Sequence, residues 1–129
     1  MTCRVHICDD EPHIILAVSV KLLKAGLQVS TATDGEAAWD VIQQERPHIV
    51  ISDLQMPRLE GTELVRRMRA HPEFRDVPVI LLTAKGFELD EEELRDELGI
   101  QHVVCKPFSP RALLQMVQSL LGAAVAVNE

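Results

Sequence analysis

Short apolar runs alternate with longer segments of helical period along this chain, and this alternation constrains the fold more than any other feature. The strands predicted from this alternation cover residues 5–8, 28–32, 49–51, 77–82 and 103–105. Strand-length runs separated by helical segments are typical of repeated βα units, which build a parallel sheet. The third run, Ile49-Val50-Ile51, is apolar throughout, as expected of a central strand with helices on both faces. The sequence therefore predicts an α/β fold around a parallel sheet.

The helical segments carry signals for where they begin and end. Pro12 suits the first position of a helix that Gly26 ends. Asp34 is expected to cap the second helix, and Ser109 to cap the last one just before Pro110. These signals place each helix between two of the predicted strands.

Two helices are strongly charged. The fourth must take its buried stripe from Leu89, Leu94 and Leu98 within an acidic stretch, whose start suits the helix dipole. The third carries Arg66, Arg67 and Arg69. We interpret both charged faces as solvated, with docking surfaces for partners as the alternative.

Length and charge limit the classes of function. The 129 residues are enough for one hydrophobic core, and we expect one domain over residues 1–122 followed by a short tail, 123–129. A net charge of −7 argues against direct nucleic-acid binding, which usually needs a basic face. The sequence shows no signal peptide and no apolar stretch long enough to cross a membrane, so we expect a cytoplasmic protein.

The three cysteines show no spacing typical of a metal site or a disulfide framework. Cys3, Cys8 and Cys105 are an odd number without a Cys-x-x-Cys pair. We interpret them as reduced core thiols.

Polar residues follow four of the five predicted strands within one or two positions. They are Asp9, Asp53, Thr83 and Lys106, with Asp10 beside the first. A single polar residue after a strand is an ordinary turn feature. However, ligands of open parallel sheets bind beyond the carboxyl ends of the strands, so these residues should converge. The sequence predicts one site at this edge of the sheet.

The predicted charges at this site require a cation. Three carboxylates close together repel, and Lys106 supplies only one positive charge. An all-oxygen site with open positions favours Mg²⁺, whose two charges complete the balance. A phosphoryl group would then meet neutral or positive potential, and an Asp carboxylate can attack its phosphorus to form an acyl phosphate. Thr83 can donate a hydrogen bond to a phosphoryl oxygen.

These residues occur in motifs that resemble the receiver domains of two-component response regulators, including the chemotaxis regulators. The motifs are Asp9-Asp10, the run Asp53-Leu54-Gln55-Met56-Pro57 with Gly61 after it, Thr83-Ala84, and Lys106-Pro107-Phe108. They span the whole chain in the expected order, each at a predicted strand end. The resemblance implies a doubly wound, flavodoxin-like, five-stranded parallel sheet of order 2-1-3-4-5. It also implies a cis Lys106-Pro107 bond.

The resemblance further implies a role for each residue of the site. Asp53 is the phosphoacceptor, Asp10 and Asp53 bind Mg²⁺ with the Gln55 carbonyl, Asp9 acts through metal-bound water, and Lys106 contacts the phosphoryl group. The phosphoryl donor would be a sensor histidine kinase or a histidine phosphotransfer protein. The output would be a contact with a downstream protein, and a phosphorylation-dependent dimer is compatible with this. Such a domain catalyses only its own phosphorylation and dephosphorylation.

The sequence departs from the family pattern at one position. Receiver domains usually carry Tyr or Phe three residues before the strand-end lysine, and this chain has Val103 there and no tyrosine. We therefore expect the usual aromatic rotamer switch to be absent. We interpret neighbouring His102 as solvent-facing, with a part in the altered switch as the alternative.

Three alternative functions share parts of this pattern. A haloacid-dehalogenase-type phosphatase needs a second Asp where this chain has Gln55, which cannot transfer a proton. A flavin-mononucleotide protein needs a phosphate loop after the first strand, where Asp9-Asp10-Glu11 repels phosphate. The stronger alternative is a receiver-like protein-binding module that is not regulated by phosphorylation.

Overall fold

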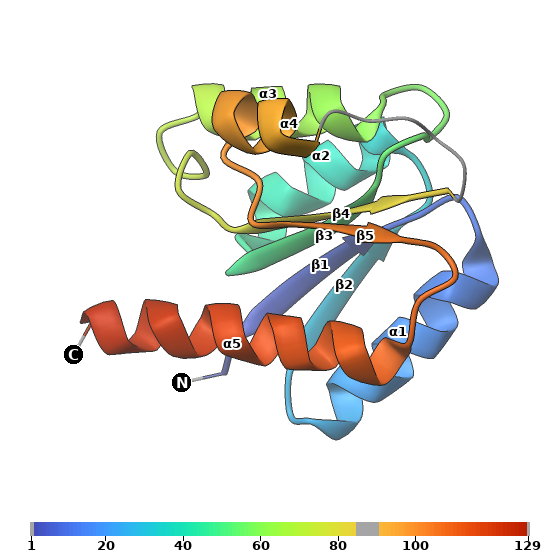
Figure 1. Ribbon diagram of the computed structural model, residues 1–129, viewed down its shortest axis with the longest axis vertical. Coiled ribbons are helices and arrows are strands. Elements are labelled where there is room, and N and C mark those ends of the chain that lie inside the picture. Colours follow the sequence, from blue (N-terminus) through green and yellow to red (C-terminus); the bar gives the residue numbers. More distant parts are fainter. Residues whose placement is uncertain (1, 85–90, 129) are drawn as a thin grey trace.

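The computed structural model describes residues 2–84 and 91–128, and within these ranges strands and helices alternate without exception (Figure 1). The strands are β1 (Arg4–Cys8), β2 (Gln28–Ala32), β3 (Ile49–Asp53), β4 (Val79–Thr83) and β5 (His102–Cys105). The helices are α1 (Pro12–Lys24), α2 (Gly35–Glu45), α3 (Gly61–Ala70), α4 (Glu91–Leu98) and α5 (Pro110–Asn128). All strand pairs are parallel, in the order β2-β1-β3-β4-β5. The α/β class, the flavodoxin-like architecture and the strand order are confirmed.

Helices cover both faces of this sheet (Figure 1). On one face α1 and α5 pack over an aliphatic cluster that includes Ile7, Ile51 and Leu82. On the other face α2, α3 and α4 cover a cluster that includes Cys8, Val50 and Leu81. Because both faces are covered, β3 and β4 are buried along their whole length.

The predicted helix signals act as expected. Asp34 accepts a hydrogen bond from the Ala37 amide at 2.9 Å, and the Ala112 amide lies 3.3 Å from the Ser109 hydroxyl. Gly26 has φ +87°, a conformation that favours glycine at a helix end. None of the helices in the described part of the chain is long and apolar enough to cross a membrane.

Several boundaries differ from the sequence-based expectation, and those of β4 and α5 have a clear physical reason. The fourth strand begins at Val79 rather than Val77, because Pro78 has no N–H and the Val77 amide donates back to Phe74. Helix α5 runs on to Asn128 through the segment expected to be a tail, an alanine-rich stretch that favours helix. Leu89, expected in the buried stripe of the fourth helix, lies outside the described residues, whereas Leu98 is buried as expected.

The cysteine interpretation holds for two residues and is wrong for the third. All three thiols are free; Cys8 is buried and Cys3 is half-buried. Cys105 is exposed, because it ends the edge strand β5 where no further strand covers it. It is therefore not a core thiol.

The arginines of α3 do not form one solvated basic face. Arg66 pairs with Glu97, and Arg67 pairs with Glu36. Arg69 instead turns inward, and its Nε donates to the Leu98 carbonyl at 2.7 Å. Burial lowers the pKa of this guanidinium. Only tertiary packing distinguishes the three, because the sequence does not show which arginine of the helix meets buried carbonyls.

Candidate functional site

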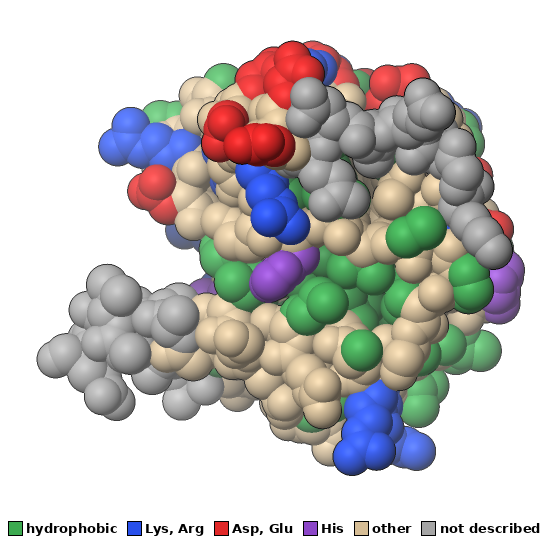
Figure 2. Space-filling model, viewed as in Figure 1, with side chains coloured by type: hydrophobic (Ala, Val, Ile, Leu, Met, Phe, Trp, Pro, Cys, Tyr) green, Lys and Arg blue, Asp and Glu red, His purple; other side chains and the backbone are tan. Residues whose placement is uncertain are grey.

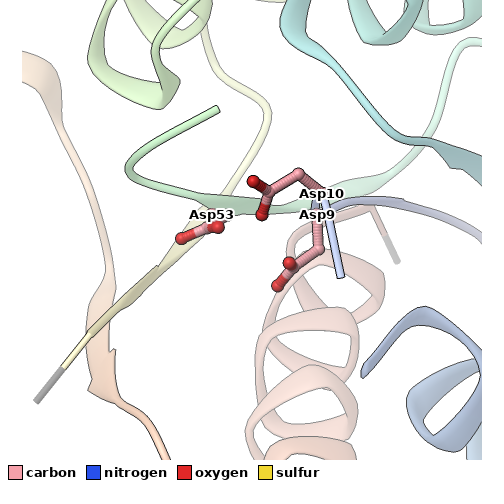
Figure 3. A group of neighbouring side chains, drawn as sticks. All are labelled: Asp9, Asp10 and Asp53. Atoms are coloured by element: carbon pink, nitrogen blue, oxygen red, sulfur yellow. The ribbon is translucent and has the colours of Figure 1, made fainter. Parts of the chain in front are cut away.

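The carboxyl ends of β1 and β3 bring the predicted acidic residues together. Asp9 directly follows β1, Asp53 ends β3, and the two strands pair with Cys8 beside Ser52. Figure 3 shows the carboxylates of Asp9, Asp10 and Asp53 gathered at this edge of the sheet. One oxygen from each of the three lies within 4.8 Å of the others. The predicted convergence is thus present.

Asp9 is fully buried and held from two sides. Its Oδ1 accepts the Glu11 amide at 2.9 Å, and its Oδ2 lies 2.9 Å from Lys106 Nζ. The side chain of Asp9 is therefore fixed in position by the Glu11 amide of its own loop and by Lys106, which follows the edge strand β5.

Lys106 is the cation of this site. It follows β5, and its Nζ lies 2.9 Å from Asp9, 3.0 Å from Glu11 and 3.4 Å from Asp53. Burial would lower the pKa of this ammonium, but its hydrogen bonds to Asp9 and Glu11 prevail and raise the pKa above its usual value. Lys106 is thus charged whenever the protein is folded near neutral pH.

Asp53 is a nearly buried carboxylate, with 9% of its side chain exposed. Burial and the charge of Asp9 raise the pKa of Asp53 to about 6, although Lys106 opposes them. The ionised form of Asp53 is therefore poorly compensated by the protein alone.

The donor set fits a divalent cation. Asp9, Asp10, Glu11 and Asp53 bring four negative charges to one ammonium. Carboxylate oxygens are the ligands that Mg²⁺ prefers, and Asp10 is exposed, which leaves room for water in the coordination shell. Gln55 lies in the loop two residues beyond Asp53 and is exposed.

The neighbouring strand and helix shape the rest of the site. Thr83, almost fully buried, ends β4 beside β3, and its Oγ1 is 3.5 Å from the Ala84 carbonyl oxygen. This contact is too long to hold the hydroxyl strongly. A Cβ at Gly61 would overlap the carbonyl oxygen of Asp53, so only glycine lets α3 begin this close to β3.

The position of the usual aromatic switch is occupied by a packed aliphatic side chain. Val103 lies in β5 beside Leu81 and packs, half-buried, against the cluster that includes Leu98 and Ile100. His102 is part of β5 and is also half-buried, so it is not simply solvent-facing as expected. The strand predicted over residues 103–105 is therefore present, but it begins one residue earlier, at His102.

Sequence reasoning gave Glu11 no role in the site beyond repelling a bound phosphate. Its Oε2 lies 3.0 Å from Lys106 Nζ across 95 residues of chain. A third acidic residue directly after Asp9 and Asp10 was the available signal. It could not show which of the acidic side chains faces the lysine.

Comparisons with known proteins agree with this geometry. A family model described as the response regulator receiver domain matches residues 5–118. The alkaline phosphatase synthesis transcriptional regulatory protein PhoP of Bacillus subtilis is 34% identical over 121 residues, 94% of this chain and 49% of that protein. The chain spans about half the length of the curated relatives it matches.

Two solved structures are similar over nearly the whole chain. The chemotaxis response regulator CheY4 of Vibrio cholerae is 30% identical with a TM-score of 0.83, covering 93% of this chain and 99% of that chain. The receiver domain of the sensor histidine kinase PA1611 of Pseudomonas aeruginosa is 26% identical with a TM-score of 0.82, covering 95% and 99%. That structure is described with a magnesium ion coordinated in its active-site cleft.

Proposed function

This chain belongs to the family of response regulator receiver domains, and on that premise we propose that Asp53 accepts a phosphoryl group from a phosphohistidine protein. The observation that carries this proposal is the placement of Asp53. It is a nearly buried carboxylate beside Asp9, with a single ammonium, Lys106, between them.

The chemistry is a phosphoryl transfer between two side chains. A carboxylate oxygen of Asp53 forms a bond to phosphorus as the bond from phosphorus to the donor imidazole nitrogen breaks, and the imidazole takes up a proton. Lys106 then balances charge on the phosphoryl oxygens, and the Thr83 hydroxyl donates a hydrogen bond to one of them. Water can later cleave the acyl phosphate and restore Asp53.

Mg²⁺ would be held by Asp10, Asp53 and the Gln55 carbonyl, with Asp9 acting through bound water. When bound, it supplies the positive charge that lets an anionic phosphoryl group approach these carboxylates. The poor compensation of Asp53 by Lys106 alone supports this assignment. The affinity of the site for Mg²⁺ would therefore depend on Asp9 and Asp53, which also contact Lys106.

We propose that this domain is not an enzyme toward separate substrates and that its output is a protein contact. A sensor histidine kinase or a histidine phosphotransfer protein would be the phosphoryl donor.

The curated relatives are named transcriptional regulators, but the half of each relative that matches corresponds to this acidic domain. An acidic surface gathers over α4 (Figure 2) and includes Glu92, Glu93, Asp96 and Glu97. Such a surface favours basic protein partners over nucleic acid.

Intact-mass measurement tests the proposal. Incubation with acetyl phosphate and Mg²⁺ should add one phosphoryl group to the native protein and none to Asp53→Asn or to protein in metal-free buffer. A phosphohistidine protein should give the same result at lower donor concentration. The alternative, a binding module not regulated by phosphorylation, is favoured if neither donor modifies the native protein.

A further inference from the structure

Three carboxylates crowd around the ammonium of Lys106 in this structure. A lysine ammonium has three N–H donors. Three carboxylate oxygens surround Nζ, from Asp9 at 2.9 Å, Glu11 at 3.0 Å and Asp53 at 3.4 Å. An incoming phosphoryl oxygen therefore competes with these carboxylates for the ammonium, and the Glu11 carboxylate accepts a hydrogen bond from Nζ.

The three partners differ in how easily they can leave. Asp9 is fully buried and pinned by the Glu11 amide, so releasing it would bury an unpaired charge. Asp53 is the proposed acceptor and stays beside the new phosphoryl group. Glu11 has 47% of its side chain exposed, so water can solvate its carboxylate as it leaves. Glu11 is thus the partner that costs least to displace.

The position of Glu11 in the chain supports this. It is the residue before α1, in extended conformation, a position where the shorter side chains of Ser, Thr, Asp or Asn usually accept a helix amide. Here its side chain makes no such capping bond and is turned to Lys106 instead. Once released, it would lie at the positive end of the α1 dipole, a favourable place for an anion. A second stabilised position is therefore available to it.

We propose that Glu11 is a positioning residue that occupies the phosphoryl-binding place on Lys106 in the resting protein and is displaced when Asp53 is phosphorylated. This rests on the proposed phosphoacceptor role of Asp53. Glu11 competes with the phosphoryl group for one N–H of Lys106, so it slows phosphorylation and weakens binding of phosphoryl mimics. Its release also couples the modification of Asp53 to the start of α1.

Two variants separate the contact from its charge. Glu11→Gln removes the carboxylate, and Glu11→Asp keeps the charge but retracts it by one methylene from Lys106. Both should speed phosphorylation by acetyl phosphate with Mg²⁺ by about two- to fivefold, the range expected for losing a half-exposed ion pair. Glu45→Gln is the matched control, because Glu45 is exposed and lies at the other edge of the sheet, so its rate should equal that of the native protein.

Beryllofluoride affinity gives a readout that does not depend on the donor. Calorimetric titration with beryllofluoride and Mg²⁺ should show both Glu11 variants binding about two- to fivefold tighter than native protein. If Glu11→Asp behaves as native while Glu11→Gln is faster, charge rather than contact is responsible and the proposal is overturned. Unchanged or weaker binding in both variants also overturns it. Failure of native protein to be modified would instead remove the proposed function itself.

Discussion

The two edges of the sheet place charged side chains in opposite ways. At the amino edge, where β1, β3, β4 and β5 begin, two arginines lie against backbone carbonyls that need donors. Arg4 donates to the carbonyls of Glu45 and Arg46, at the end of α2. At the carboxyl edge, carboxylates gather around one lysine. Arginines at the amino edge thus donate hydrogen bonds to backbone carbonyls. The carboxyl edge instead holds more negative charge than Lys106 can compensate.

Arg69 shows how much the amino edge depends on one side chain. Its guanidinium lies within hydrogen-bonding distance of the carbonyls of Phe74, Arg75, Val77, Leu98 and Gly99. These carbonyls belong to the loops that lead into β4 and β5. Contacts at the amino edge thus stabilise the fold, which allows the carboxyl edge to hold a charge arrangement that folding alone would not favour.

The largest expected effect comes from removing the amino-edge donor. Arg69→Ala should lower the free energy of unfolding by about 3–4 kcal/mol, because several partly buried carbonyls lose their donor at once. Urea denaturation measures this. Arg67→Ala is the control on the same helix: it breaks only a surface pair with Glu36, so its loss should stay under about 1 kcal/mol. Equal losses in both variants would contradict the special role of Arg69.

Asp53→Asn should raise the free energy of unfolding, whereas Arg69→Ala lowers it. This substitution therefore tests the carboxyl edge. A group whose pKa is raised in the folded state, here from 3.8 to about 6, stabilises below pH 3.8 and loses this contribution as pH rises through 6. At pH 7.5 without Mg²⁺ the ionised Asp53 therefore costs about 2–3 kcal/mol, which Asp53→Asn should recover in urea denaturation.

Two controls test the origin of that gain. Asp40→Asn, an exposed change of the same kind on α2, should alter stability by less than about 0.5 kcal/mol. Adding Mg²⁺ should raise the unfolding midpoint of the native protein and leave that of Asp53→Asn nearly unchanged. A destabilised Asp53→Asn protein would show that the carboxyl edge is not under charge strain.

Between the two edges, β1 buries a histidine that makes the sheet sensitive to acid. His6 is fully buried, its Nδ1 lies 2.9 Å from the Ser30 hydroxyl, and its Nε2 has no partner. Burial lowers its pKa from 6.5 to about 4, so its contribution to stability is complete above pH 6.5 and is lost as pH falls toward 4. Between pH 7 and pH 5 this should cost about 2 kcal/mol.

His6→Leu removes the titrating ring and should remove this part of the acid sensitivity. Urea denaturation of both proteins at pH 7 and pH 5 gives the difference in pH dependence, which cancels any change in packing common to both conditions. Equal pH dependence in the two proteins would show that the protonated ring is accommodated.

The smallest effect on stability is expected at Asp34, a carboxylate of the carboxyl edge that accepts a hydrogen bond from a backbone amide. Asp34 caps α2 through the Ala37 amide, so Asp34→Ala should cost about 1 kcal/mol. Asp34→Asn keeps the acceptor and should cost less. Thermal unfolding monitored by circular dichroism measures both. A gain in stability from Asp34→Ala would contradict this, and would show that Asp34 takes part in the charge repulsion of the site.

Much of the fold was predictable because local signals and the global fold agree. Pro12, Asp34 and Ser109 marked helix starts where the structure has them, and the strand-end positions of Asp9 and Asp53 predicted their convergence. The strand order came from the resemblance and not from periodicity. The roles of Asp53, Lys106, Thr83 and the metal ligands stay predictions until phosphorylation is measured.

The amino-acid sequence alone was enough to predict the alternation of strands and helices, the polar residues at the strand ends and the family. Three-dimensional packing was needed to show that Arg69 turns inward while Arg66 and Arg67 pair at the surface, and that the Glu11 carboxylate contacts Lys106. The physical reason is separation along the chain. Local patterns record propensity and periodicity, whereas a contact across 95 residues depends on how the whole sheet aligns its edges.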